Sequence, residues 1–500
     1  MTATSDTPAG TPYTPAGAPA SSGRDVRSIL RSVAWMTAGG SVNAGLTVVR
    51  GLVFANILGP AAYGVWGFLA TIQNMSVYAD LGVGQVVARD LPRAMASGDH
   101  ERAGTLMALA RVWTSVACLV FGVALVALWP LLRWPQAAGW PVLVPILLCG
   151  MGLYTTAGTV EGGSKAFRRL ALITTGAGIL ALAGGVAGSL ALGVTGLAIS
   201  QAVVYGGAGV LAIALRPSMA KLANLGHAWR TAVREGWRLL LPSLGLQVFV
   251  SVDVLIVAWA FQPSALGLYS VALLGSGLVA GVLASGVASV VGPHLLGETA
   301  AADADAPSAM VWGPAAALAW VLAPACAIAA FLTPLVLVLL LPKYAAAATP
   351  AVVLLAAAYC LHSQFGFSKT FVAIGRPAAT LPLYAVLTPL NVAVDILLIR
   401  QGLGLLAVAA GSLVVNALFL LSHEVLVAYR VSRGRRQYAQ MAATLAAAGL
   451  PVAAAASVLG YTALAWGAAA LGLAGWFGLT FVAWRWLGPR FTLRARPGAL

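Results

Sequence analysis

The sequence predicts an all-α polytopic membrane protein of about 14 transmembrane helices, with two six-helix lobes in parallel repeat plus a C-terminal helix pair. Of its 500 residues, 60% are hydrophobic and only 9% are charged, whereas a soluble chain carries roughly 25% charged residues. Apolar stretches of the ~20 residues needed to cross a bilayer recur from residue 33 to residue 487. A phrase containing Pro60 and Gly64 also returns 203 residues later, around Pro263 and Gly267.

The predicted helices follow one another with short connections. We expect spans at residues 33–57, 61–88, 104–129, 139–161, 170–191, 195–215, 238–261, 265–291, 311–341, 345–374, 378–399, 404–429, 441–463 and 467–487. Residues 1–30, rich in Pro, Ala, Ser and Thr, predict a disordered cytoplasmic tail. The predicted parts are then an N-lobe (31–216), an amphipathic cytoplasmic linker (217–237), a C-lobe (238–430), a last helix pair (431–488) and a basic cytoplasmic tail (489–500).

Basic residues indicate which side of the membrane each loop faces. They crowd the loops that share a side with the N-terminus, whereas the opposite turns hold only Arg133, Lys343 and Arg400. Because cytoplasmic loops carry an excess of Lys and Arg, we expect a multi-pass protein of the plasma (inner) membrane with both termini cytoplasmic. The net charge of +15 then reflects topology and contact with membrane lipids, and does not indicate nucleic-acid binding.

The repeat relates the two lobes and exchanges one charge. Residues 193–200 match residues 402–409 at an offset of 209, which supports a duplicated unit. Because six is an even number of spans, the copies have the same orientation, and two such lobes can rock around a central cleft. Superposing the copies places Arg50 on Asp253, at equivalent positions of the first helix of each lobe.

Arg50 and Asp253 are ionisable residues at membrane depth. Each lies ~13 Å below the nearest outer turn, at ~1.5 Å per helical residue. Such residues usually face a bundle interior or an aqueous cavity, where a guanidinium can bind a diphosphate by paired hydrogen bonds. Alternatively, Arg50 and Asp253 neutralise each other across the lobe interface, or form a gate that opens when phosphate arrives.

Other polar residues in the spans are weaker candidates. Arg111 either meets the entering diphosphate or extends to the inner interface, and Lys369 is a further candidate for the cavity. Asp80 either pairs with Arg50 or Arg111 or caps a helix. Uncharged polar residues suit sugar recognition, and buried interhelical hydrogen bonding explains them nearly as well: Asn43, Gln73, Asn74, Gln201, Gln247, His362, Ser363 and Gln364.

Two acidic residues of the C-lobe raise separate questions. Glu424 follows His423, and a carboxylate beside a titratable imidazole is a candidate for proton coupling. Asp395, near the outer end of its span, is expected to be satisfied by Arg400 or by local backbone.

Several stretches carry a family resemblance. Residues 55–68 (ANILGPAAYGVWGF) and 78–90 (YADLGVGQVVARD) resemble the start of polysaccharide flippases, O-antigen-type translocases of the multidrug/oligosaccharidyl-lipid/polysaccharide exporter superfamily. Residues 238–270 resemble the start of their second lobe, and 341–355 with 372–377 their tenth span. The resemblance covers roughly residues 30–430. It implies a two-lobed flippase for polyprenyl-diphosphate-linked glycans, and it supports a cavity-facing Arg50.

The motifs of ATP binding and hydrolysis, GxxxxGK[ST], GxSxG and HExxH, do not occur in the chain. We therefore expect a transporter rather than an enzyme, with no cofactor or metal, driven by an ion gradient, the membrane potential or consumption of its product. The favoured cargo is a polyprenyl-diphosphate-linked oligosaccharide, with a polysaccharide polymerase as a candidate partner. The alternatives are a cation-coupled multidrug exporter, a peptidoglycan-precursor flippase and a non-transporting scaffold of a glycan-synthesis complex.

Overall fold

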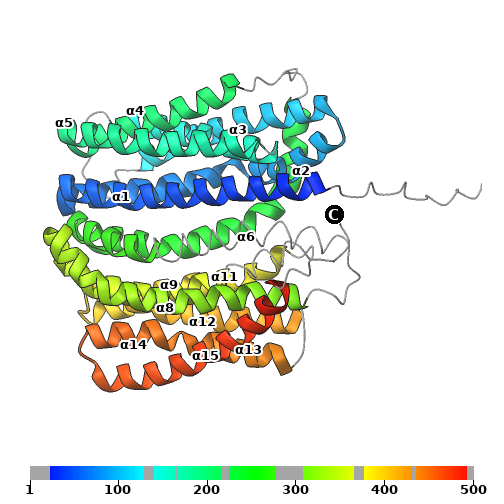
Figure 1. Ribbon diagram of the computed structural model, residues 1–500. Coiled ribbons are helices and arrows are strands. Elements are labelled where there is room, and N and C mark those ends of the chain that lie inside the picture. Colours follow the sequence, from blue (N-terminus) through cyan, green and yellow to red (C-terminus); the bar gives the residue numbers. More distant parts are fainter. Residues whose placement is uncertain are drawn as a thin grey trace, which may run out of the picture.

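The computed structural model describes residues 23–128, 140–164, 166–215, 225–277, 308–364, 377–430 and 435–491. Within these ranges the chain forms helices and turns without any strand, which confirms the all-α prediction. The long helices lie nearly parallel in one bundle (Figure 1). Eleven helices in the described part are long and apolar enough to cross a membrane. Since two of them contain backbone breaks, the count of 14 spans stays a prediction.

The first group of helices packs as one unit in the upper half of Figure 1. In it, α4 lies between α3 and α5, and α1 packs along α5. Its members are α1 (Gly23–Ser76), α2 (Val83–Ala96), α3 (His100–Leu128), α4 (Trp140–Gly163) and α5 (Phe167–Leu215).

Two of these helices contain a break that folds the chain back on itself. In α1, Gly59 has φ 72° and ψ 171°, a conformation that residues with a Cβ rarely adopt, and Pro60 follows it. In α5 the break falls at Leu192 and Gly193. Arg50 and Asn74 therefore line one cavity, although 24 residues of straight helix would separate them by ~36 Å. Both breaks lie where the sequence predicts a turn between spans.

The second group of helices occupies the lower half of Figure 1. Its first helix is α6 (Leu225–Ala260), and residues 263–277 are also helical. The remaining members are α8 (Ser308–Leu340), the 3₁₀ turn η4 (Pro342–Ala347), α9 (Ala348–His362), η5 (Pro377–Thr380), α11 (Leu381–Arg400) and α12 (Leu405–Arg430).

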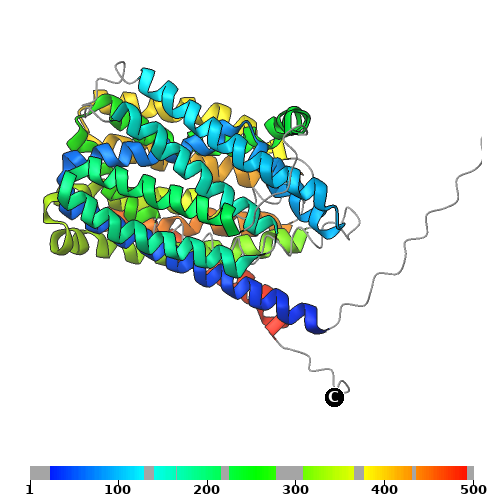
Figure 2. The same cartoon turned by 90° about the horizontal axis from the view of Figure 1, so that it is seen from above.

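The C-terminal helices α13 (Arg435–Ala447), α14 (Gly449–Val458) and α15 (Thr462–Phe491) pack together and against α8. They extend the second group, as expected for an appended pair. The start of α1 and the end of α15 lie at the same end of the bundle in both views (Figures 1 and 2). This geometry is consistent with the prediction that both termini share one side.

The predicted linker differs from the structure. We expected a separate interfacial helix over residues 217–237, yet its described part from Leu225 onward is continuous with α6. Its apolar face packs on α2 and α3: Ala232 is buried, and the Trp229 ring lies 5.0 Å from that of Trp113. That face therefore contacts protein, because α2 and α3 offer a complementary apolar surface.

The two copies of the repeated phrase meet at one end of the bundle, which is the predicted outer end. A Cβ atom on Gly64 would overlap the carbonyl of Pro263, and a Cβ atom on Gly267 would overlap the carbonyl of Pro60. The two backbones thus touch directly, an approach that small residues allow. We call this reciprocal packing the glycine contact.

At the opposite, predicted inner end, α2 lies against the start of α6. Arg89 forms an ion pair with Glu235 at 2.5 Å, and the backbones of Gly82 and Gly236 pack without room for a Cβ on either. We call these interactions the inner contact. The first helix group thus touches the helix of residues 263–277 at one end of the bundle and α6 at the other.

Candidate functional site

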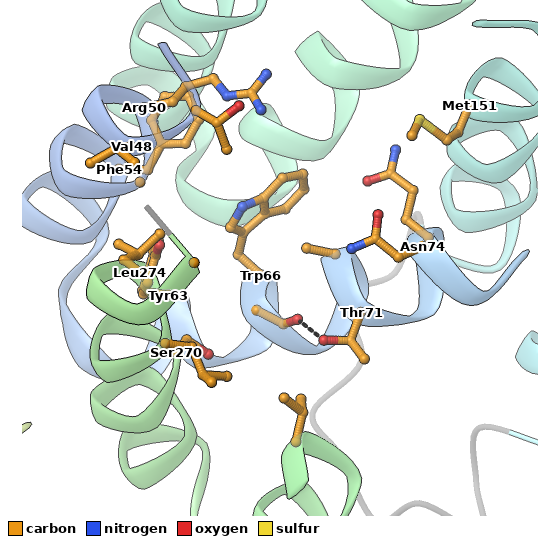
Figure 3. A pocket seen from close by; sticks show the side chains of 18 of the residues that line it. Val48, Arg50, Phe54, Tyr63, Trp66, Thr71, Asn74, Met151, Ser270 and Leu274 are labelled. Atoms are coloured by element: carbon orange, nitrogen blue, oxygen red, sulfur yellow. Dashed lines mark hydrogen bonds between the residues drawn. The ribbon is translucent and has the colours of Figure 1, made fainter. Parts of the chain in front are cut away.

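A cavity of about 680 Å³ lies between the two groups of helices, bounded by α1, α4, α5, α6 and the helix of residues 263–277. We call it the central cavity (Figure 3). Its described wall combines aromatic, amide, hydroxyl and aliphatic side chains with one arginine. The polar and aromatic residues are Asn43, Thr47, Arg50, Phe54, Tyr63, Trp66, Thr71, Gln73, Asn74, Tyr154, Tyr205 and Ser270.

Arg50 supplies the positive charge of this cavity. Its Nη1 atom donates a hydrogen bond of 2.8 Å to the hydroxyl of Tyr205, and the ring of Tyr205 packs 5.0 Å from that of Tyr154. The described lining contains no acidic residue. The guanidinium therefore keeps donors for an anionic ligand, and Figure 3 shows Arg50 and Trp66 among the side chains around the cavity.

Three of the predicted polar residues also line the central cavity, namely Asn43, Gln73 and Asn74. The side chain of Gln73 is 5% exposed, and its Nε2 atom has no hydrogen-bond partner within the described residues. A buried donor of this kind is costly unless a ligand or water satisfies it. Gln73 is thus available to a polar ligand.

Sequence reasoning missed the aromatic lining, which consists of Phe54, Tyr63, Trp66, Tyr154 and Tyr205. An aromatic residue in an apolar span has the same local pattern whether it faces a cavity or the core. Only the recurrence of tyrosines in spans close to polar residues could have drawn attention to them.

Asp253 does not pair with Arg50 in this structure. Its carboxylate accepts hydrogen bonds from Asn391 Nδ2 (2.6 Å), from Tyr269 (3.3 Å) and from the Ser412 hydroxyl. Asp253 lies on the face of α6 that packs against α11 and α12, whereas the next residue, Val254, lines the central cavity. The predicted ion pair and gate are therefore not present in this conformation.

A second carboxylate lies close to Asp253. Asp395 is fully buried one helical turn after Asn391. Within the described residues, neither carboxylate oxygen of Asp395 nor Oδ1 of Asn391 has a hydrogen-bond partner. The expected satisfaction of Asp395 by Arg400 is wrong, because Arg400 is exposed at the helix end and Asp395 turns into the packing between α11 and α12.

We call Asp253, Asn391, Asp395 and Ser412 the carboxylate cluster. The polar side-chain atoms of this cluster are all oxygens apart from the Asn391 amide nitrogen. Oxygen ligands suit a hard cation or a shared proton. The described residues contain no group of three or more His, Cys, Asp or Glu side chains placed to hold a metal. Any cation here would therefore be held by two carboxylates with amide and hydroxyl oxygens.

Asp80 caps a helix. Its carboxylate accepts hydrogen bonds from the backbone N–H groups of Gly82 (2.9 Å) and Gly84 (2.8 Å), at the start of α2. The predicted span 61–88 is accordingly broken between α1 and α2, where Leu81 and Gly82 adopt positive φ. Pairing with Arg50 is not found, since Arg50 donates to the hydroxyl of Tyr205 instead.

The remaining predicted charges that the structure describes lie apart from the central cavity. Arg111 is 7% exposed within α3 and does not line that cavity. Lys369 falls outside the described residues. His423 and Glu424 are both buried, and Gln364 connects them: its Oε1 lies 3.0 Å from His423 Nδ1, and its Nε2 donates to Glu424 Oε1 at 3.2 Å.

A smaller hollow of about 190 Å³ lies next to this connection, and we call it the C-lobe chamber. It is bounded by Tyr78 of the first helix group and otherwise by α6, α9, α11 and α12 and the residues that follow α9. The predicted residues Gln247, His362, Gln364 and His423 all line it, together with Tyr78, Tyr384 and Phe419.

The described residues thus form a bundle of helices long and apolar enough to cross a membrane, with a cavity between two groups of them. The chain belongs to the family of polysaccharide biosynthesis proteins, whose model matches residues 29–296, more than half of its length. No curated protein matches the sequence.

Solved transporters share this fold. A lipid II flippase, MurJ, in an inward closed conformation aligns with a TM-score of 0.66 and 12% identity, covering 90% of this chain and 99% of that one. An inward-facing multidrug resistance MATE transporter aligns at 0.60 with 16% identity, covering 79% and 96%. A MOP superfamily transporter from Pyrococcus furiosus, described as having a binding pocket of reverse polarity, aligns with a TM-score of 0.56 and 16% identity, covering 79% of this chain and 96% of that one.

Proposed function

We propose that this protein flips a polyprenyl-diphosphate-linked oligosaccharide from the cytoplasmic to the outer face of the plasma membrane, for polysaccharide biosynthesis. The observation that carries the proposal is the Arg50 guanidinium in a cavity between two lobes whose described lining has no acidic residue. A planar guanidinium can hold phosphate oxygens by two parallel hydrogen bonds. A phosphate can accept from donors of Arg50 that are not used by Tyr205.

The rest of the cavity suits a glycan. Amide groups of Asn43, Gln73 and Asn74 can donate to and accept from sugar hydroxyls, and the Trp66 ring presents an apolar face. Ligand sites combine aromatic walls with a few placed polar groups in this way, over volumes of roughly 300–1,000 Å³. The central cavity falls within that range.

A cation-coupled multidrug exporter is the alternative. A cationic drug would be attracted to carboxylates in the cavity wall, and the described wall offers Arg50 instead. The two acidic residues nearby, Asp253 and Asp395, are enclosed within the second helix group. The charge of the cavity thus favours an anionic lipid, and an intact cavity speaks against a non-transporting scaffold.

We further propose that the coupling ion binds at the carboxylate cluster. Two carboxylates within electrostatic range in an apolar interior repel each other, and Asp395 has no hydrogen-bond donor among the described residues, so a proton or a small cation would stabilise the pair. Binding there would bias the packing of α6 on α11 and α12. His423 and Glu424, connected by Gln364, remain the second candidate for proton transfer.

The test of the cargo is a lipid extract from cells that lack the protein, analysed for polyprenyl-diphosphate glycans by mass spectrometry. We expect such a lipid to accumulate and to clear when the wild-type protein is restored. Arg50→Gln should not clear it although the variant protein is present in the membrane. Arg400→Gln, which removes an exposed arginine at the end of α11, should clear it as the wild type does.

Two results would contradict the proposed cargo. One is an absence of accumulated lipid-linked glycan combined with new sensitivity to cationic compounds, which would support the exporter. The other is full clearance by Arg50→Gln, which would remove the diphosphate site from the mechanism. A polymerase that consumes the delivered glycan would supply part of the driving force.

A further inference from the structure

The C-lobe chamber and the central cavity lie along the same helix faces. On α6, Val254 lines the central cavity, whereas Val250 and Gln247, four and seven residues earlier, line the chamber. Residues at this spacing project from one face of a helix. Asn74 and Tyr78, also four residues apart, make the same connection on the first helix group. The two hollows therefore follow one cleft.

The chamber is the deeper of the two, measured from the glycine contact. Arg50 precedes the break at Gly59 by nine residues, or ~13 Å of helix. Gln247 precedes the end of α6 by 13 residues, and Phe419 follows the start of α12 by 14, or ~20 Å in each case. A glycan attached to a diphosphate at Arg50 and directed inward would therefore pass the chamber.

The chemistry of the chamber suits one sugar ring. Tyr384 and Phe419 are stacked with ring centroids 5.8 Å apart, and Phe419 also lies 5.4 Å from the His423 ring. These rings are held from behind by Phe249, which is 2% exposed and does not line the chamber. Aromatic faces can cover the apolar face of a sugar, while the Gln247 and Gln364 amides can bind its hydroxyls.

Size excludes larger occupants. About 190 Å³ is less than the roughly 300–1,000 Å³ of sites for drug-sized ligands. The chamber can thus enclose one ring but not a whole oligosaccharide.

We propose that the C-lobe chamber is a sugar subsite, which binds one ring of the lipid-linked glycan while Arg50 holds the diphosphate. This inference rests on the proposed function. It assigns Phe419 and Tyr384 to stacking and Gln247 to recognition of hydroxyl groups. The sugars near the diphosphate, and not only the lipid carrier, would then determine which cargo is accepted.

The test uses the purified full-length protein and two synthetic probes, undecaprenyl diphosphate and the same lipid carrying a trisaccharide. Native mass spectrometry gives their dissociation constants. We expect the wild type to bind the glycosylated lipid about two- to tenfold more tightly, the gain expected of a few aromatic contacts. Phe419→Leu, which keeps an apolar side chain but removes the ring face, should abolish this gain and leave the bare lipid unaffected. Gln247→Leu should reduce the gain.

The matched control is Phe249→Leu, which alters the same aromatic cluster behind the chamber and should keep the gain. Equal affinity of the wild type for both lipids would overturn the subsite. So would a Phe419→Leu variant that weakens both lipids alike, since the chamber would then hold the isoprenoid chain or act only through packing. Arg50→Gln separates the two proposals. Unchanged binding of undecaprenyl diphosphate by this variant would contradict the diphosphate site. The chamber is tested instead by the difference in affinity between the glycosylated and the bare lipid.

Discussion

Arg50 is the only charged side chain in the described lining of the central cavity, and Tyr205 is the residue that holds it. The two positions are 155 residues apart in the chain. Their hydrogen bond orients the guanidinium across the cavity and keeps its remaining donors available. Tyr205 is therefore expected to position Arg50 without binding the cargo itself.

This role predicts the effect of Tyr205→Phe. Loss of one hydrogen bond should weaken undecaprenyl diphosphate binding about two- to tenfold, in line with a net worth of ~0.5–1.5 kcal/mol. Combined with Arg50→Gln, it should cause no further loss, because both changes remove the same interaction. Tyr154→Phe is the control and should bind as the wild type does. Additive losses in the double variant would show that Tyr205 acts independently of Arg50.

A second prediction about a single residue concerns Asp395. If the carboxylate cluster binds a cation, the midpoint of thermal unfolding should rise with NaCl but not with choline chloride at equal ionic strength. If it binds only protons, transport should depend on the pH gradient instead. Asp395→Asn should abolish whichever dependence the wild type shows, and Asp99→Asn, an exposed aspartate, should preserve it. A variant that keeps the wild-type ion dependence would exclude Asp395 from coupling.

The glycine contact determines how two helices approach each other at the predicted outer end. Since a Cβ on Gly64 would overlap the Pro263 carbonyl, Gly64→Ala should hold the lobes apart there and favour an outward-open state. We expect faster labelling of a cysteine placed in the central cavity by an impermeant maleimide added from outside. Gly275→Ala, with nothing within 4 Å of the new Cβ, is the matched control. Equal labelling rates would mean that the contact does not limit opening.

Helix α2 carries an ion-pair network outside the membrane spans. Arg89 donates to Asp90 at 2.7 Å, and Arg93 and Arg102 lie within 4 Å of the same carboxylate. The hydrogen bond from Arg89 is the main reason why the pKa of Asp90 is lowered. A lowered pKa contributes stability that is present above the ordinary aspartate value, near 3.9, and is lost as the pH falls through the folded value.

The lowered pKa of Asp90 predicts how the stability of this network changes in acid. Unfolding midpoints measured from pH 7 to pH 3 should fall more steeply for the wild type than for Asp90→Asn. At pH 7 the variant should be slightly less stable, because exposed pairs contribute little. Parallel curves for the two proteins would mean that Asp90 does not gain stability from its arginine partners.

At the scale of the whole molecule, the glycine contact and the inner contact lie at opposite ends of the cleft. Access from either side therefore requires one of them to open. Arg89→Cys with Glu235→Cys, made after replacing the four native cysteines, should be joined by a short cleavable bismaleimide. Transport should stop on crosslinking and resume on cleavage, whereas either single variant should be unaffected by the reagent. Undiminished transport by the crosslinked protein would exclude opening at the inner contact.

Hydropathy and chain breaks allow the sequence by itself to determine the class of protein and the order of its helices. Length and apolarity predict the eleven helices that are long and apolar enough to cross a membrane in the described part of the chain. The turns at Gly59 and Gly193 follow from local glycine residues, with a proline next to Gly59. The sequence also singles out Arg50 with Asn43, Gln73 and Asn74, because polar groups in apolar spans must turn toward protein or a cavity. In the structure these four residues line the same cavity.

Only the tertiary structure decided which partners these groups have. Asp253 meets Asn391 and Ser412, which are 138 and 159 residues away, rather than Arg50. Asp80 caps α2 instead of pairing, and Asp395 turns inward. The physical reason is that helices apolar on all sides carry no periodicity to show which face is buried. Which charges meet then depends on how the helices pack, and that is a property of the assembled lobes.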